Sequence, residues 1–487
     1  MRGLLLGLLA VAALPCFAAP APVPEIAGAI QGAVATRHEI VLGGRTLSYE
    51  AIFAETPLAD AAGRPLATIS ATSYIKLPED PSRPVLFAFN GGPGASSSPL
   101  HFGAFGPRLI VAGPDGKKVL ADNPQSLLAD ADLVFIDPVG TGFSRVLPGG
   151  DGQPYWSVDG DAKAVLDLMR GWQAEHRRAA LFIAGESYGG FRLARMAKDA
   201  GDLPVKGLIL ISPLLDASAS SEAVGNDLPY IFELPAMAVT AWKQGKSALR
   251  ASVPEEIFES ARRFAESDYA LALLQGDRLE PAERDRVAAR MAALIGLPAQ
   301  TIADNRLRIE TQLFLSTLLA EQDKIVGRLD GRVAAPVRRD LPTDRPAAAN
   351  DPSLGLGQSN VIRSAPATDY FTRELGVPEN RDYVSLTLDV NFRWDFHSAG
   401  RDELFYVNPT PNIGVLMKAQ PEARLLLIGG YYDLAVPLLS ARYAVERAGL
   451  PMDRVSYAAF ESGHSPFEGE EARVRMKSLL RDFLLGR

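Results

Sequence analysis

The sequence predicts an α/β fold, with a mainly parallel central sheet flanked by helices and a mostly helical insertion. Short, almost fully apolar runs are typical of strands buried on both faces of a parallel sheet, and they occur at residues 84–89, 130–137, 179–185, 205–212, 423–430 and 455–462. Helical patterns lie between several of these runs. In SVDGDAKAVLDLMRGW, for example, Val165, Leu168 and Trp172 fall on one face. Strands that alternate with helices indicate a parallel sheet.

The start of the chain predicts export, followed by a β meander. Residues 1–18 consist of one Arg, an apolar stretch and small residues, which is the layout of a secretory signal peptide, and we expect cleavage after Ala18. The segment 36–77 alternates and turns at Gly43-Gly44, which predicts an antiparallel meander. Cys16 is the only cysteine and lies in the predicted leader, so the mature chain has no disulfide and no cysteine ligand for a metal.

The alternation of strands and helices breaks between about residues 217 and 375. Here DRVAARMAALIGLP has apolar residues at helical spacing, and RIETQLFLSTLLAEQ is predicted to form a second helix. A loop rich in Pro, Gly, Asn and Ser follows at 340–360. We therefore expect an α/β core in two parts, 19–216 (with the meander) and 376–487, and a helical lid, 217–375, inserted between them.

Composition excludes several classes of partner. The 487 residues carry a formal net charge of −8, and no basic run is longer than two residues, whereas nucleic-acid binding requires clustered Lys and Arg. Beyond the leader, no segment has 18 consecutive apolar residues, so we expect no transmembrane segment. We also expect neither a metal nor a cofactor, and the oligomeric state stays open.

The most informative motif is LFIAGESYGG (181–190). An apolar strand pattern runs into Gly185-Glu186-Ser187-Tyr188-Gly189, a G-x-S-x-G, and a helix pattern follows. This is the context of a nucleophile elbow, where a strained turn needs small residues two before and two after the serine. Ser187 is therefore the predicted nucleophile.

A serine hydroxyl needs a base, and in folds with this elbow the acid and then the histidine follow later in the chain. Only two histidines, His397 and His464, follow Ser187. His464 comes directly after the apolar strand near 455–462, whereas His397 follows no such strand. Asp433 lies just past the preceding strand. The order Ser187, Asp433, His464 predicts a triad in which His464 is the base and Asp433 orients it.

The oxyanion formed at Ser187 needs two N–H donors. One is expected from the backbone of Tyr188, and the other from a loop after an earlier strand. We assign that role to FAFNGGPGASSS (87–98). The stretch is no phosphate cradle, because it lacks G-x-x-x-x-G-K-[ST] and Pro93 removes an N–H. Its serines lack the small-x-Ser-x-small pattern of a nucleophile, so the loop assists chemistry done elsewhere.

Several motifs together resemble the serine carboxypeptidase family: FNGGPGASSS, IDPVGTGFS, GESYGG, the Asp433 loop and Gly463-His464. The resemblance extends from about Pro84 to the C-terminus, with a poor match in the lid. Members of that family are α/β hydrolases that remove C-terminal residues from peptides, often at acidic pH. The resemblance thus implies an exported serine carboxypeptidase, periplasmic or extracellular, that acts on peptides with a free C-terminus.

The resemblance also implies roles for three further residues. Gly92 would supply the second oxyanion N–H beside Tyr188. Asn90 and Glu186 would hydrogen-bond the terminal carboxylate of the peptide. Glu186 must then be protonated, since two carboxylates meet only if one takes a proton, and this is the usual account of an acidic optimum.

Three positions depart from the family pattern. Ala95 stands where the family usually has Cys, Ala104 where an acidic residue is common, and Ser465 where a methionine often follows the catalytic histidine. These departures leave the side-chain preference and the strength of carboxylate recognition open. An esterase or acyltransferase on the same scaffold is the alternative function, and a non-catalytic binding protein is a further one.

Overall fold

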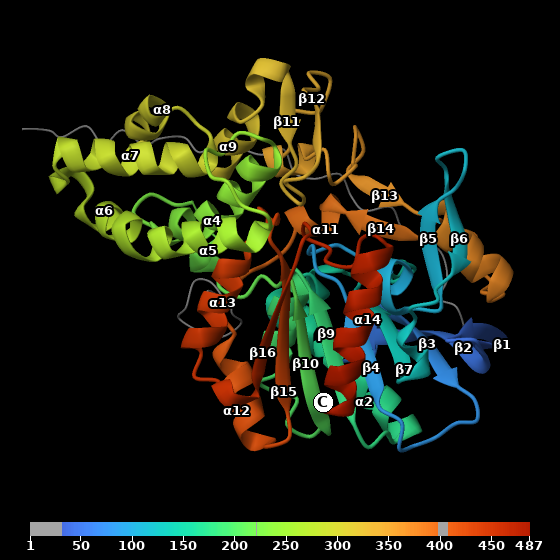
Figure 1. Ribbon diagram of the computed structural model, residues 1–487. Helices are drawn as coiled ribbons and strands as arrows, with labels where there is room; N and C mark the ends of the chain where they lie inside the picture. The colour runs from blue at the N-terminus through green and yellow to red at the C-terminus, as the bar shows by residue number, and fades with distance from the viewer. Residues whose placement is uncertain (1–31, 221, 398–407) are drawn as a thin grey trace, which may run out of the picture.

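The computed structural model describes residues 32–220, 222–397 and 408–487, so the predicted signal peptide lies outside the described residues. At the centre of the described chain is a ten-stranded sheet (Figure 1). Its strands are Ala33–Leu42 (β1), Arg45–Ala59 (β2), Pro65–Lys76 (β3), Val85–Phe89 (β4), Asp132–Asp137 (β7), Arg145–Val146 (β8), Leu181–Glu186 (β9), Val205–Ile211 (β10), Arg424–Gly430 (β15) and Val455–Phe460 (β16). Their spatial order is β1-β2-β3-β7-β4-β9-β10-β15-β16, and β8 pairs with β3.

The sheet is antiparallel at one side and parallel over the rest. β1, β2 and β3 form the predicted antiparallel meander, and Gly43 and Gly44, with φ values of 57° and 76°, connect β1 to β2 as hairpin turns require. From β7 through β4, β9, β10 and β15 to β16, neighbouring strands are parallel. These strands are the six predicted apolar runs, which confirms the α/β class. Their carboxyl ends meet at one edge of the sheet.

Helices cover both faces of the parallel strands. Along β4, alternate residues point to opposite faces: Phe87 and Phe89 belong to one hydrophobic cluster, and Leu86 and Ala88 to another. The first cluster includes residues of four helices, Val158–His176 (α2), Tyr188–Met196 (α3), Pro411–Ala419 (α12) and Leu438–Arg447 (α13), whereas Glu470–Leu485 (α14) packs on the second. Burial on both faces explains why the inner strands are largely apolar, whereas β16, at the end of the sheet, is partly exposed. None of the helices in the described ranges has the length and apolar character needed to cross a membrane.

The chain between β10 and β15 is first helical and then irregular. The helices are Leu228–Lys243 (α4), Pro254–Phe264 (α5), Ala270–Gln275 (α6), Pro281–Ile295 (α7), Ala299–Asp304 (α8) and Thr311–Thr317 (α9). They are followed by two small hairpins, Lys324–Val326 (β11) with Ala334–Pro336 (β12), and Val361–Arg363 (β13) with Val384–Thr387 (β14), and by the short helices Ala365–Asp369 (α10) and Leu388–Phe392 (α11). The helix predicted over RIETQLFLSTLLAEQ is shorter than the pattern, since α9 ends at Thr317 and a 3₁₀ turn follows. A further hairpin, Arg108–Ala112 (β5) with Lys118–Asp122 (β6), was not predicted.

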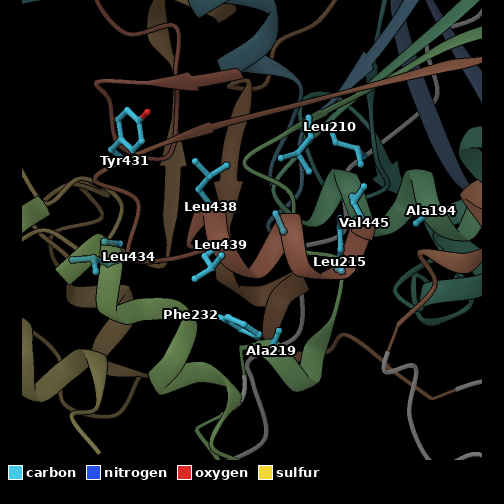
Figure 2. Close-up of a cluster of buried hydrophobic side chains, with 14 of the residues drawn as sticks. Ala194, Leu210, Leu215, Ala219, Phe232, Tyr431, Leu434, Leu438, Leu439 and Val445 are labelled. Atoms are coloured by element: carbon cyan, nitrogen blue, oxygen red, sulfur yellow. The ribbon is translucent and has the colours of Figure 1, made fainter. Parts of the chain in front are cut away.

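The helices of this insertion share a hydrophobic core with the sheet (Figure 2). Phe232 of α4 lies beside the side chains of α13 and of the chain that follows β10, and its ring is 4.5 Å from that of Tyr443. The ring centroid of Phe258 in α5 lies 5.2 Å from that of Tyr431, which follows β15. One buried cluster thus continues from the sheet into α4 and α5, so the base of the insertion is packed as part of the core.

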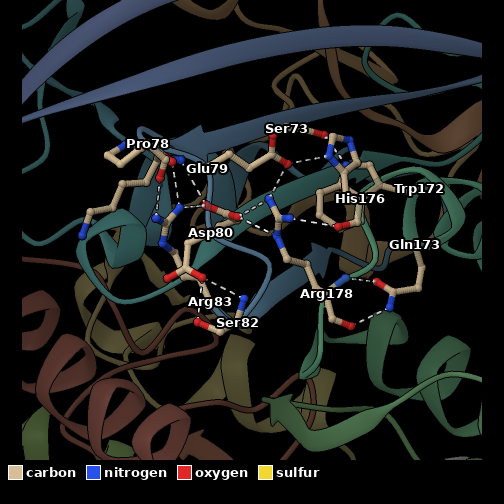
Figure 3. A network of polar contacts seen from close by, with 12 residues as sticks. Ser73, Pro78, Glu79, Asp80, Ser82, Arg83, Trp172, Gln173, His176 and Arg178 are labelled. Carbon is tan, nitrogen blue, oxygen red and sulfur yellow. Dashed lines mark hydrogen bonds and ion pairs between the residues drawn. The ribbon is translucent and has the colours of Figure 1, made fainter.

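The opposite edge of the sheet, where the parallel strands begin, is held by a buried ionic network (Figure 3). Asp132, the first residue of β7, accepts hydrogen bonds from the guanidinium groups of Arg83 (2.8 Å) and Arg178 (2.9 Å) and from the backbone N–H of Lys76 (3.0 Å). Asp132 and Arg178 are both fully buried. The network therefore joins the starts of β4, β7 and β9 on the side of the sheet away from the carboxyl ends.

Candidate active site

Ser187 lies at the sharp turn between β9 and α3, in the strand–turn–helix context predicted for it. Its backbone has φ 60° and ψ −128°, a conformation that residues other than glycine rarely adopt. A Cβ atom on Gly185 would lie 2.3 Å from the carbonyl oxygen of Gly189, and one on Gly189 would lie 2.9 Å from that of Phe89. The tight approach of these backbones is the physical reason for the two glycines of G-x-S-x-G.

Asp433 and His464 follow the neighbouring strands β15 and β16, and their side chains meet. His464 Nδ1 lies 2.7 Å from Asp433 Oδ2, and Asp433 is fully buried. The other carboxylate oxygen, Oδ1, accepts hydrogen bonds from the backbone N–H groups of Ala435 (2.8 Å) and Val436 (2.9 Å). Burial lowers the pKa of His464, but the carboxylates of Asp433 and Glu186 together more than offset this, and the pKa lies above its usual value. The histidine is thus oriented by Asp433.

A cavity of about 540 Å³ opens at the carboxyl edge of the strands. Every predicted site residue lines it except Asp433, which lies behind His464. Among the described residues, no hydrogen bond joins the side chains of Ser187 and His464; contacts between nucleophile and base are often loose without substrate and tighten in its complex. His397, the other histidine after Ser187, contacts Asp395 and does not line the cavity. Much of the remaining wall is apolar and is formed by Leu214, Ala348, Ala349, Leu354, Ile362, Leu386, Leu388, Phe392 and Val436.

The backbone of the loop after β4 lies against the start of α3. A Cβ atom on Gly91 would lie only 2.3 Å from the backbone nitrogen of Tyr188, so the two segments touch. In the described part of the chain, neither the N–H of Tyr188 nor that of Gly92 has a hydrogen-bond acceptor. Two free backbone donors next to Ser187 are what an oxyanion hole requires.

A distant segment holds this loop in place. The N–H of Thr387 donates to the carbonyl oxygen of Gly94 (2.8 Å), and the N–H of Ser96 donates to that of Ser385 (3.0 Å). Gly94 has φ +97°, and a Cβ atom there would lie 2.3 Å from the oxygen of Thr387. β14, which contains Ser385 and Thr387, therefore interlocks with the loop after β4.

Glu186 and Asn90 form the second polar group of the cavity. The amide of Asn90 donates to Glu186 Oε2, and the hydroxyl of Ser465 donates to Glu186 Oε1 (2.9 Å). Glu186 is almost fully buried, and burial raises its pKa to about 7 although these two hydrogen bonds oppose the shift. Glu186 can therefore carry a proton near neutral pH.

The structure adds two residues that the sequence analysis did not assign to the site. Ser465, noted only as a departure from a family pattern, is a hydrogen-bond partner of Glu186. Arg328, in the loop between β11 and β12, lines the cavity, although no motif surrounds it in the sequence. Ala104, which stands where the family commonly has an acidic residue, is buried, and its carbonyl oxygen accepts a hydrogen bond from the side-chain amide of Asn123 (2.8 Å).

Comparisons with known proteins agree with this geometry. A profile of the serine carboxypeptidase family matches residues 73–230. Serine carboxypeptidase-like 36 of Arabidopsis thaliana is 34% identical over 122 residues, covering 24% of this chain and 24% of that protein. The pheromone-processing carboxypeptidase kex1 of Sclerotinia sclerotiorum is 33% identical over 163 residues, covering 30% of this chain and 24% of that protein. The matched segment thus spans about a quarter of the length of these relatives.

The fold has a counterpart among solved structures. It is similar to Kex1Δp, a prohormone-processing carboxypeptidase from Saccharomyces cerevisiae, with a TM-score of 0.54 and 14% identity over 90% of this chain and 91% of that one. The structural match extends the similarity in fold beyond residues 73–230 to the parts that contain Asp433 and His464. Residues 73–230 are thus similar in sequence to the serine carboxypeptidase family, and the α/β fold of the described chain is similar to that of a carboxypeptidase.

Proposed function

We propose that this protein is an exported serine carboxypeptidase that hydrolyses C-terminal peptide bonds through an acyl-enzyme intermediate, with its highest activity at acidic pH. The observation that carries the proposal is the pair of Glu186 and Asn90 beside Ser187. A carboxyl group with a pKa of about 7 and an amide can both donate hydrogen bonds to a terminal carboxylate. An esterase has no need of such a pair next to its nucleophile.

In the proposed reaction, His464 takes the proton of Ser187 as the hydroxyl attacks the carbonyl carbon of the last peptide bond. Asp433 stabilises the imidazolium that forms, and the N–H groups of Gly92 and Tyr188 stabilise the oxyanion. His464 then gives its proton to the leaving amine, and the released residue carries the original C-terminus. Water attacks the acyl-enzyme in the same way, with His464 again as the base.

The protonation of Glu186 and that of His464 are coupled. The negative charge of Glu186 contributes to the raised pKa of His464. One proton shared between them gives either a charged pair or two neutral groups. A substrate carboxylate repels an ionised Glu186, so its binding favours the neutral pair, in which His464 is free to act as a base. This explains how a raised histidine pKa is compatible with acidic activity.

The proposal of export rests on residues 1–18, which have the layout of a signal peptide. Either the periplasm or the extracellular space would satisfy it. Expression of the full chain, followed by N-terminal sequencing of the secreted form, tests this part: a start at Ala19 supports it, and an intact Met1 in the soluble cell fraction contradicts it.

The activity is tested with N-blocked dipeptides at pH 4 to 6, by measuring the free amino acid released. We expect release by the native protein, loss of release in Ser187→Ala, and native rates in Ser267→Ala, whose serine is exposed on the insertion. The same dipeptides with an amidated C-terminus should be poor substrates. Turnover of simple esters without cleavage of any blocked peptide would contradict the proposal and indicate an esterase.

A further inference from the structure

Among the described residues that line the cavity, Arg328 is the only arginine, and there is no lysine. The lining contains one carboxyl group, that of Glu186, and one histidine, His464; the other lining residues are apolar or neutral. A guanidinium group in a largely apolar substrate cavity is an unusual feature, because charged groups are desolvated there unless a partner is present.

The guanidinium group has donors to spare. Its Nη2 donates to the carbonyl oxygen of Ala435 at 3.3 Å. Within the described ranges, its other nitrogens have no hydrogen-bond acceptor, none of them is buried, and no carboxylate forms an ion pair with it. Since a guanidinium has five N–H donors in a planar fork, several remain directed at solvent or at a bound molecule.

The backbone that carries Arg328 is fixed to both loops of the predicted triad. The N–H of Leu434, next to Asp433, donates to the carbonyl oxygen of Arg328 (3.0 Å), and the N–H of His464 donates to that of Leu329 (2.7 Å). Arg328 thus has a defined position relative to the reacting atoms. Such preorganisation reduces the entropy lost when a ligand binds.

The acidic groups that face Arg328 from the insertion do not neutralise it at acidic pH. Glu233 of α4 is buried, and this burial together with nearby Glu222 raises its pKa to about 8, so that it is protonated below that pH. His464 lies close to Arg328 on the side of the triad, and Asp351, whose carboxylate accepts hydrogen bonds from the N–H of Leu329 (2.8 Å) and the hydroxyl of Ser353 (2.6 Å), forms no ion pair with Arg328 within the described ranges. The positive charge of Arg328 can therefore pair with an anionic group of a bound substrate.

The place of Arg328 in the sheet separates it from the pair of Asn90 and Glu186. That pair lies at the ends of β4 and β9, whereas Arg328 contacts the loop after β15, with β10 between β9 and β15. Neighbouring strands are ~4.8 Å apart, so roughly 10 Å separate the two ends of the cavity. The two groups therefore start from separate ends of the cavity wall, so a terminal carboxylate held by Glu186 leaves Arg328 for a second one.

We propose that Arg328 is a specificity residue that binds a substrate carboxylate on the acyl side, so that peptides with Asp or Glu as the penultimate residue are preferred. The inference rests on the proposed carboxypeptidase function and names its substrate class. The apolar walls of the cavity would contact the methylene groups of such a side chain, and the guanidinium would pair with its carboxylate in the two-pronged geometry that arginine favours.

The test compares N-blocked Glu-Leu, Gln-Leu and Ala-Leu at about pH 5.5, where the substrate glutamate is ionised and Glu186 is protonated. We expect native kcat/KM to be ~10-fold or more higher for Glu-Leu than for Gln-Leu, the size of a charged hydrogen bond. In Arg328→Gln this ratio should fall to about 1. The ratio is the readout, because the charge of Arg328 also lowers the pKa of His464 and its loss acts on all the dipeptides alike. Arg338→Gln, which removes an exposed arginine of the same insertion, should retain the native ratio.

Two outcomes overturn the inference. If Arg328→Gln retains the preference for Glu-Leu, Arg328 does not bind the side chain of the penultimate residue. If it lowers kcat/KM equally for all free-acid dipeptides and spares their esters, Arg328 binds the terminal carboxylate instead. N-blocked Glu and Gln ethyl esters keep the test independent of the proposed function, since they probe the acyl side even if no peptide is cleaved. Failure of the native protein on every dipeptide would reject the carboxypeptidase itself.

Discussion

The pH dependence of peptide cleavage provides the sharpest test of the role of Glu186. Its pKa of about 7 follows from burial, which the hydrogen bonds from Asn90 and Ser465 only partly offset. If the substrate carboxylate binds only the protonated form, kcat/KM falls as pH rises through this value. The protonated fraction is ~0.9 at pH 6 and ~0.09 at pH 8, so the native enzyme should lose about tenfold between them.

Substitution of Glu186 by Gln removes the titration and retains a hydrogen-bond donor. In Glu186→Gln, kcat/KM for a blocked dipeptide should therefore change by less than about twofold between pH 6 and 8. The loss of a negative charge next to His464 should also lower the pKa of this histidine and move the acidic limb of the profile to lower pH. The assay is release of free leucine from a blocked dipeptide, measured in half-unit steps from pH 4 to 9.

The control is Glu468→Gln. The negative charge of Glu468 also raises the pKa of Glu186, but Glu468 does not line the cavity. In Glu468→Gln, kcat/KM should therefore still fall at basic pH, and the midpoint of this fall should move slightly to lower pH because a like charge is lost. A tenfold fall from pH 6 to 8 that persists in Glu186→Gln would refute the reasoning, since some other group would then be titrating.

Three further predictions concern the backbone donors and the scaffold. Tyr188→Phe should retain most activity, because the residue acts through its N–H; a loss as large as that of Ser187→Ala would refute this. Gly91→Ala should force the loop away from the N–H of Tyr188 and lower kcat by about 10²- to 10³-fold with little change in KM; native kcat would show that the loop makes no catalytic contact. Asp132→Asn leaves buried Arg178 without its charge partner and should lower the free energy of unfolding by about 3 kcal/mol, as measured by urea denaturation. The folded fraction of this variant should have the same KM as the native protein.

The strands and the predicted triad could be read from the sequence because each carries a local signal. A strand buried on both faces is apolar over most of its length, as β9 is before Glu186 and β15 is after Arg424. Ser187 and Asp433 follow such strands and His464 follows the partly exposed strand β16, and parallel strands bring their carboxyl ends together whatever the chain length between them. A topological rule therefore predicted that Asp433 and His464 meet, 246 and 277 residues beyond the serine by numbering.

The remaining features depend on contacts that leave no local pattern. Arg328 comes from an irregular loop of the insertion, and long-range hydrogen bonds, from Leu434 to Arg328 and from His464 to Leu329, fix this loop at the cavity. Ser465 could be recognised as unusual, but its partnership with Glu186 depends on how two loops pack. The helix expected at 308–322 ends early at Thr317, because burial on the core, rather than helical propensity, decides where the chain turns.

The interlock between Gly94 and Thr387 limits how such an enzyme can diversify. Ser385, Leu386 and Leu388 line the cavity, and the backbones of Ser385 and Thr387 also hold the loop that contains Gly92. If Gly92 and Tyr188 are the proposed oxyanion donors, we expect a change of wall shape here to alter their positions, so that specificity and rate change together at this point. A chimaera that exchanges the insertion for that of a relative should therefore place its second junction before Val384, so that β14 is retained. Natural variation in substrate preference should concentrate in positions of the cavity wall outside the β13–β14 hairpin.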